Sequence, residues 1–328
     1  MIPDHYTLGG SDVSVPPLGV GTWAWGDRAT WGMGGYDTGL TIHSIREAWD
    51  ASIDAGVTLF DTAEVYGGGE SERIIGRLSA GDPGRASSSV VATKFMPSPW
   101  KVQVERALLS SVRASLDRLG LPAVDLYQIH GPISLRSHNA LADALAAAHQ
   151  AGLVRAVGVS NYSVKETRAM AAALQARGMR LATNQIEFSL LRRSPETSGL
   201  LAACKELGVV PLAYSPIGQG RLTGKYSAAN PPRGNRQFSN HPMAVVDGVV
   251  SELRDIGEKH GGKVPSQVAL NWVMTKGAIP IPGAKSRHQA EENAGALGWS
   301  IDDEDVARLD GVALAGIRNL RSRLWQHG

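Results

Sequence analysis

Four residues that could carry acid–base chemistry lie close behind apolar segments of the sequence. Asp61, Lys94 and His130 each stand directly after a short apolar segment, and Tyr66 lies in the glycine-rich stretch after Asp61. Each residue has a plainer interpretation when taken singly: an aspartate after a strand is often a helix N-cap, and a lysine there is usually solvated. An acid, a base and a phenol at the ends of successive segments are much less expected by chance, so the set predicts a reaction site.

These residue types suit the reduction of a carbonyl group, which needs a hydride donor and a proton donor. An unperturbed tyrosine has a pKa of about 10 and is a poor acid at neutral pH. A nearby ammonium group stabilises the phenolate, and we expect Lys94 to supply that charge while Asp61 holds Lys94 in place. We expect His130 to polarise the substrate carbonyl through a hydrogen bond.

The elements that must position these residues alternate regularly along the chain. Short, apolar segments rich in β-branched residues, typical of strands buried on both faces, cover 20–22, 57–60, 90–93, 124–129, 154–159, 182–186, 209–213 and 278–281. Apolar residues at helical spacing cover 44–55, 103–119, 137–151, 164–177, 199–207 and 245–260. Glycines 56, 120, 152 and 208 stand between a helix and the next strand, where a left-handed C-cap is expected. The pattern predicts one (β/α)₈ TIM barrel over residues 1–328.

Three further segments lie outside this repeat. Residues 6–18 alternate around Gly9-Gly10 and predict an N-terminal β-hairpin that plugs the bottom of the barrel. Long, glycine-rich loops cover 24–40 after the first strand and 218–243 after the seventh. Both loops follow strands, so we expect them at the C-terminal face, where barrel enzymes carry their active sites.

Composition narrows the function classes. The 328 residues include 33 basic and 31 acidic ones, a balance that argues against a nucleic-acid partner. The single cysteine, Cys204, excludes a disulfide within the chain and speaks against a cysteine metal site. Since no apolar run is long enough to span a membrane and no signal peptide is evident at the start, we expect a cytoplasmic protein. Its oligomeric state stays open.

The tetrad region resembles a known family. Residues 60–67, Phe-Asp-Thr-Ala-Glu-Val-Tyr-Gly, followed by Glu70-Ser71-Glu72, look like the aldo-keto reductase signature around the catalytic aspartate and tyrosine. Thr93-Lys94 and 128–130 are similar to that family's catalytic lysine and histidine strands. The resemblance implies a catalytic tetrad of Asp61, Tyr66, Lys94 and His130, in which Tyr66 is the general acid.

The same resemblance implies the cofactor NADP(H) and its contacts. It implies that Ser160, Asn161 and Gln185 hydrogen-bond the carboxamide of the nicotinamide. It also implies that the Tyr214 ring stacks on the nicotinamide. The first strand brings Gly21, Thr22 and Trp23 toward the nicotinamide, and Asp61 is counted with the cofactor contacts as well. The segment that covers the pyrophosphate contributes Ser215, Pro216, Ile217, Gly218, Gly220, Leu222 and Lys225, and the adenosine site contributes Ile281, Gly283, Ala284, Lys285, Arg287, Gln289, Glu292 and Asn293. Lys285 and Arg287 at a helix start independently suit a 2′-phosphate.

The substrate pocket is harder to predict. The family's longer barrels shape it with C-terminal loops, and the tail after Asp310 is short here. We therefore expect a helix and a loose end in the tail, and substrate contacts from elsewhere. Aromatic residues near the mouth are the candidates, either as pocket walls or as anchors of the core: Trp23, Trp25, Trp31, Trp100, with Tyr66 and His130. Aromatic walls would favour flat or apolar carbonyl compounds.

Other functions are less well supported. Residues 19–24 match the dinucleotide-binding pattern G-x-G-x-x-A, but a loop follows where that motif needs a helix. A metal-dependent hydrolase needs more histidines and carboxylates at strand ends than His130 and Asp61, so we expect no metal. A serine hydrolase needs a G-x-S-x-G elbow, which the chain lacks. The remaining alternative is an NADP-binding regulatory subunit with little turnover, like the channel-associated proteins of this family.

Overall fold

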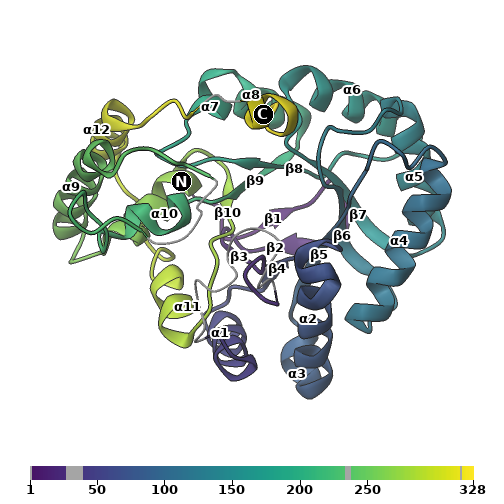
Figure 1. Cartoon of the computed structure of the whole chain (residues 1–328), viewed down its shortest axis with the longest axis horizontal. Coiled ribbons are helices and arrows are strands. Elements are labelled where there is room, and N and C mark those ends of the chain that lie inside the picture. Colours follow the sequence, from purple (N-terminus) through teal and green to yellow (C-terminus); the bar gives the residue numbers. More distant parts are fainter. Residues whose placement is uncertain (1, 27–39, 233–237, 318–319) are drawn as a thin grey trace.

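Eight parallel strands form the centre of the computed structural model, which describes residues 2–26, 40–232, 238–317 and 320–328 (Figure 1). They are β3 (Gly19–Gly21), β4 (Leu59–Asp61), β5 (Val90–Phe95), β6 (Val124–Ile129), β7 (Val154–Ser160), β8 (Thr183–Glu187), β9 (Val210–Tyr214) and β10 (Ile279–Pro280). Each strand pairs with the next one in the sequence. This order confirms the predicted (β/α)₈ barrel.

The first and last strands meet through two glycines, which closes the barrel. Gly21 forms a parallel bridge with Gly283, and the Gly21 N–H donates to the Pro282 carbonyl at 2.9 Å. A Cβ on Gly21 would lie only 2.8 Å from the Ile281 carbonyl oxygen. The absence of a side chain therefore permits the close approach of the two backbones.

Helices cover the outside of the barrel (Figure 1). They are α1 (Ile42–Asp54), α2 (Glu70–Gly81), α3 (Pro83–Ala86), α4 (Val104–Leu119), α5 (His138–Gln150), α6 (Val164–Gln175), α7 (Ser194–Thr197), α8 (Leu200–Leu207), α9 (Met243–Lys259), α10 (Pro265–Thr275), α11 (Arg287–Ala294), α12 (Asp303–Val312) and α13 (Leu320–Trp325), with 3₁₀ turns η1 (Tyr66–Gly69) and η2 (Gly218–Thr223). In the part of the chain that the structure describes, none of these helices has the length and apolar character needed to cross a bilayer.

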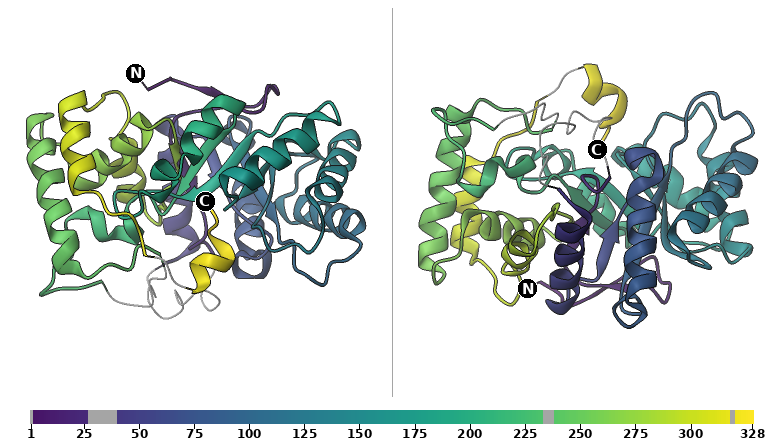
Figure 2. Two further views of the ribbon diagram at one scale, coloured as in Figure 1. Left: turned by 90° about the horizontal axis from the view of Figure 1, so that it is seen from above. Right: turned by 60° about the horizontal axis from the view of Figure 1, so that its bottom comes forward.

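The hairpin of β1 (Tyr6–Thr7) and β2 (Ser14–Val15) closes the N-terminal end of the barrel, as predicted. Its apolar residues Leu8, Val13 and Val15 are buried in one cluster with residues near the strand starts, such as Leu59 and Val210. Figure 2 shows the hairpin at one end of the molecule and α13 near the opposite end. The barrel mouth that carries the strand ends is thus separated from the plug by the packed interior.

The sequence pattern located the six predicted helices to within a few residues, but it did not single out α2 and α10. Helix α2 begins directly after three left-handed glycines, 67–69, which interrupt the pattern. Helix α10 is buried almost all round, so its apolar residues show little periodicity. Glycines 56, 120, 152 and 208 all have positive φ at helix ends, as expected.

Candidate active site

The predicted tetrad comes together at the C-terminal ends of β4, β5 and β6. The Lys94 ammonium donates to Asp61 Oδ2 at 2.6 Å, to the Thr62 carbonyl at 2.7 Å and to the Tyr66 hydroxyl at 3.4 Å. Asp61 and Lys94 are buried, whereas Tyr66 is half-buried. Burial lowers the pKa of Lys94, and the Asp61 charge opposes that shift. The chain therefore joins a phenol to a buried ion pair.

His130 lies between two aromatic rings at the end of β6. The Tyr66 ring packs edge-on at 5.7 Å, and the Trp325 ring packs edge-on at 5.6 Å. Burial, with a smaller contribution from the Lys94 charge, lowers the pKa of His130 well below its ordinary value of 6.5. The imidazole is therefore neutral at physiological pH and suited to donate a hydrogen bond rather than a proton.

The predicted carboxamide-binding residues line the mouth at the ends of β7 and β8. The Ser160 hydroxyl donates to the Gln185 carbonyl at 2.9 Å, and the Asn161 amide donates to Ser160 Oγ at 3.1 Å. The Gln185 amide donates to Asp61 Oδ1 at 2.7 Å. The Tyr214 hydroxyl donates to Asn161 Oδ1 at 2.9 Å. These groups are paired with one another, so a bound carboxamide would have to exchange some of these partners.

Two residues after strands hold unusual backbone conformations. Asn161 follows β7 with φ of 63°, and Ser215 follows β9 with φ of 51°, in the left-handed region that non-glycine residues rarely occupy. Such conformations are costly and cluster at functional sites. Asn161 Oδ1 accepts the Tyr214 hydroxyl and Ser215 directly follows Tyr214, so both turns lie beside Tyr214.

The segment after β9 forms the turn expected to cover a pyrophosphate. Gly218 and Gly220 both have positive φ within η2, and Gln219 between them does too. Ser215 and Ile217 are half-buried and Lys225 is exposed, whereas Pro216 and Leu222 are buried. Leu222 belongs to the hydrophobic core. The Leu222 side chain is therefore taken up by the core, and only its backbone could face a ligand.

The predicted adenosine residues lie around the start of α11. Ser286 caps the helix by accepting the Gln289 N–H at 3.4 Å, and Gln289 Oε1 accepts the Lys285 N–H at 2.9 Å. The Asn293 amide donates to the Gly283 carbonyl at 3.3 Å. Arg287 is exposed and Lys285 is half-buried. Thr22, Ile281 and Ala284 are buried, and Glu292 accepts the Ser266 hydroxyl at 2.5 Å.

The predicted aromatic pocket needs correction. Trp25 does not line the mouth: its side chain is fully buried, packs against Phe60 and donates to the Ala284 carbonyl at 2.8 Å. Trp100 is 78% exposed, beside Lys101, which pairs with Glu64 at 3.4 Å. Trp31 lies outside the described residues. Trp23 is half-buried and packs edge-on against Phe238, which also contacts Tyr214.

The expectation of a loose tail was wrong. Trp325 packs against His130, and the Gln326 amide donates to the Tyr214 hydroxyl at 3.0 Å. The His327 N–H donates to the Asn161 carbonyl at 3.1 Å, and Arg192 donates to the Gly328 carbonyl at 2.8 Å. The tail therefore lies across the ends of β6, β7 and β9. No local pattern in the sequence signals these contacts.

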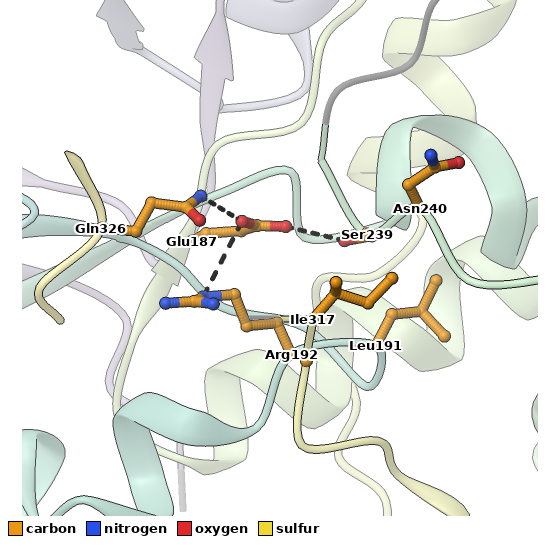
Figure 3. Close-up of a pocket in the computed structure, with 8 residues that line it drawn as sticks. Glu187, Leu191, Arg192, Ser239, Asn240, Ile317 and Gln326 are labelled. Atoms are coloured by element: carbon orange, nitrogen blue, oxygen red, sulfur yellow. Dashed lines mark hydrogen bonds and ion pairs between the residues drawn. The ribbon is translucent and has the colours of Figure 1, made fainter. Parts of the chain in front are cut away.

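A buried carboxylate links the tail to the loop after β9. Figure 3 shows Glu187 between Gln326 and Ser239, with Arg192 beside it. Glu187 accepts the Ser239 hydroxyl at 2.9 Å and the Gln326 amide, and pairs with Arg192 at 3.7 Å. Burial raises the pKa of Glu187, and the Arg192 charge opposes the shift. These groups line a cavity of about 110 Å³.

Comparisons with known proteins agree with the barrel fold. The aldo/keto reductase family model matches residues 17–314. Over 325 residues the chain is 36% identical to a chloroplastic pyridoxal reductase of Arabidopsis thaliana, covering 96% of this chain and 87% of that protein. It is 30% identical to an L-glyceraldehyde 3-phosphate reductase of Escherichia coli O157:H7, covering 97% of this chain and 93% of that one.

Solved structures of the same family share the fold. An aldo-keto reductase from Klebsiella pneumoniae in complex with NADPH has a TM-score of 0.73 and 25% identity, covering 95% of this chain and 96% of that one. The thermostable aldo-keto reductase Tm1743 has a TM-score of 0.74 and 27% identity, covering 94% and 99%. The chain therefore belongs to the aldo/keto reductase family, whose members are oxidoreductases acting on carbonyl compounds.

Proposed function

We propose that the protein reduces an aldehyde or ketone to the alcohol with NADPH, and that Tyr66 is the proton donor. One observation carries the proposal: the Tyr66 hydroxyl lies 3.4 Å from the ammonium of Lys94, which is itself paired with buried Asp61. Its ring packs beside neutral His130 at the barrel mouth. A positioned general acid with a charged neighbour is the machinery that a carbonyl reduction needs.

The residues around the mouth fit a nicotinamide coenzyme. Tyr214 offers a half-buried ring at the end of β9. Ser160, Asn161 and Gln185 offer buried hydroxyl and amide groups that match a carboxamide in size and polarity. At the far end, the start of α11 with Lys285 suits a phosphate. This donor set supports NADP(H) as the coenzyme, and the Klebsiella pneumoniae relative was solved with NADPH.

NADPH, when bound, supplies the hydride that attacks the carbonyl carbon. Tyr66 gives its hydroxyl proton to the carbonyl oxygen as negative charge develops there. The Lys94 ammonium stabilises the phenolate that remains, and Asp61 keeps that ammonium in place. Neutral His130 donates a hydrogen bond to the same oxygen, so two fixed donors surround the developing alkoxide.

Three aromatic side chains support a preference for flat, apolar substrates. Trp23 and Phe238 pack together at 5.9 Å, and Trp325 stands beside His130 at the mouth. Pockets of this kind bind ligands through apolar walls and a few polar groups. We propose substituted aromatic aldehydes as the first substrate class to test. A single domain over 1–328 and a cytoplasmic location stay predictions.

The test is NADPH oxidation, followed by absorbance, with a panel of aldehydes and ketones. The wild-type protein is expected to turn over at least one aromatic aldehyde. Tyr66→Phe is expected to lower kcat by at least about a thousandfold, within the range general acid catalysis contributes, and to keep its affinity for NADPH. Tyr6→Phe, which removes a phenol oxygen from the hairpin at the opposite end of the barrel, is the matched control. Turnover by Tyr66→Phe at the wild-type rate rules out the assignment.

A further inference from the structure

The Asp61 carboxylate is only 2% exposed, and three side chains bind it. Lys94 takes one oxygen, Oδ2. The other oxygen, Oδ1, accepts two amides: Gln185 at 2.7 Å and Gln128 at 3.3 Å. A buried carboxylate needs its lone pairs satisfied, so these amides fix which way Asp61 faces.

Gln128 is itself held by a polar layer that crosses the barrel. The strand register places Lys94 beside Gln128, Gln128 beside Gly158, and Gly158 beside Thr183. The Thr183 hydroxyl donates to Gln128 Oε1 at 3.2 Å. Gln128 and Thr183 are both fully buried. The Gln128 carbonyl is thus occupied by Thr183, which leaves its amide nitrogen facing Asp61.

The glycine in this layer makes the contact possible. A Cβ on Gly158 would lie 2.1 Å from Thr183 Oγ1 and 3.1 Å from Gln128 Cγ. Real side-chain atoms do not approach so closely, so any larger residue at 158 would displace the threonine hydroxyl. Two strands that are not neighbours therefore share a hydrogen bond through the space above Gly158.

We propose that Gln128 is a positioning residue for the reaction, which keeps the Asp61 carboxylate turned toward Lys94. The inference rests on the proposed function, because the same Gln185 amide that holds Asp61 is also assigned to the carboxamide of the coenzyme. When Gln185 turns to the coenzyme, Gln128 is the amide that still holds Asp61 Oδ1. Asp61 then keeps Lys94 beneath Tyr66.

Three substitutions test the assignment. Gln128→Met keeps the side-chain length and removes both amide groups. Thr183→Val removes the hydroxyl that orients Gln128, and Thr183→Ser retains it. In each variant kcat, KM, the pH profile of kcat and the NADPH dissociation constant from fluorescence titration are measured, with melting temperature as the check on folding.

Gln128→Met is expected to lower kcat about tenfold, because small misplacements of a catalytic group cost that much or more. Its NADPH dissociation constant and carbonyl KM should stay within about twofold, while the acidic limb of its pH profile moves to higher pH. Thr183→Val should change kcat in the same direction, and Thr183→Ser should resemble the wild type. This split separates positioning from a general loss of structure.

Two results overturn the inference. One is a folded Gln128→Met protein with the wild-type kcat and pH profile. The other is an equal loss in Thr183→Ser and Thr183→Val, which would show that the hydroxyl does not matter. A wild-type protein that reduces no carbonyl overturns the proposed function and this inference with it, whereas an active wild type with an unaltered Gln128→Met overturns this inference alone.

Discussion

Trp325 and His130, 195 positions apart in the numbering, stand edge-to-face with ring centroids 5.6 Å apart and an interplanar angle of 62°. The contact is tight, since a Cβ on Gly131 would lie 2.9 Å from the Trp325 ring. The tail that carries Trp325 is fixed by Gln326 on Glu187 and Tyr214. The indole is therefore held in a fixed position beside the residue proposed to bind the carbonyl oxygen.

Trp325→Ala is expected to raise the KM for aromatic aldehydes about tenfold, and to leave that for small aliphatic aldehydes nearly unchanged. The reason is that an aromatic contact contributes about 0.5–1.5 kcal/mol, which is up to about tenfold in affinity. Steady-state kinetics with matched aromatic and aliphatic substrates measure the difference. Leu324→Ala removes an apolar side chain from the same helix at a position that is 63% exposed, so it is the control. Equal effects on both substrate classes contradict the assignment.

The lowered pKa of His130 gives a second prediction. Between the ordinary value of 6.5 and its lower value in the folded protein, the unfolded chain binds a proton that the native protein does not. The stability that depends on neutral His130 is therefore complete above pH 6.5 and is lost as the pH falls below it. The ¹⁵N imidazole signals of His130, assigned by their absence in His130→Asn, should stay those of a neutral ring from pH 8 to pH 6. A titration midpoint near 6.5 would refute this.

Three members of the tetrad could be predicted from their places at the ends of strands, and the fourth, Tyr66, from the glycine-rich stretch after β4 that resembles the family signature. Asp61, Lys94 and His130 each end or follow an apolar run, and parallel strands bring such residues to one mouth. The place of a polar residue at the end of its strand therefore indicates which side chains from other strands it meets. The same reasoning located Asn161, directly after β7, and Tyr214, the last residue of β9.

Contacts that depend on distant segments could not be predicted. The Trp25 indole bonds to the Ala284 carbonyl, 259 positions away, and this buries a residue expected at the pocket. The Gln326 amide reaches Tyr214 only because the tail folds back across the mouth. Neither contact leaves a periodicity or a turn signal in its own segment. Phe238, which packs on Trp23, was missed for the same reason.

A third prediction concerns the preference for NADPH over NADH. Lys285 stands directly before Ser286, the N-cap of α11, where the positive end of the helix favours a phosphate. Lys285→Ala is expected to raise the KM for NADPH about tenfold or more, since charge-assisted hydrogen bonds contribute roughly 1.5–3 kcal/mol, and to change the KM for NADH less than twofold.

The comparison of the two coenzymes within one variant isolates the 2′-phosphate, because NADH differs from NADPH only by that group. Lys205→Ala, which removes an exposed cation from α8, controls for the loss of surface charge. Raising the salt concentration should weaken the NADPH preference of the wild type more than that of Lys285→Ala, because salt screens the attraction between exposed charges. If Lys285→Ala raises the KM for both coenzymes by the same factor, Lys285 does not read the 2′-phosphate, and the coenzyme preference must come from other residues around α11.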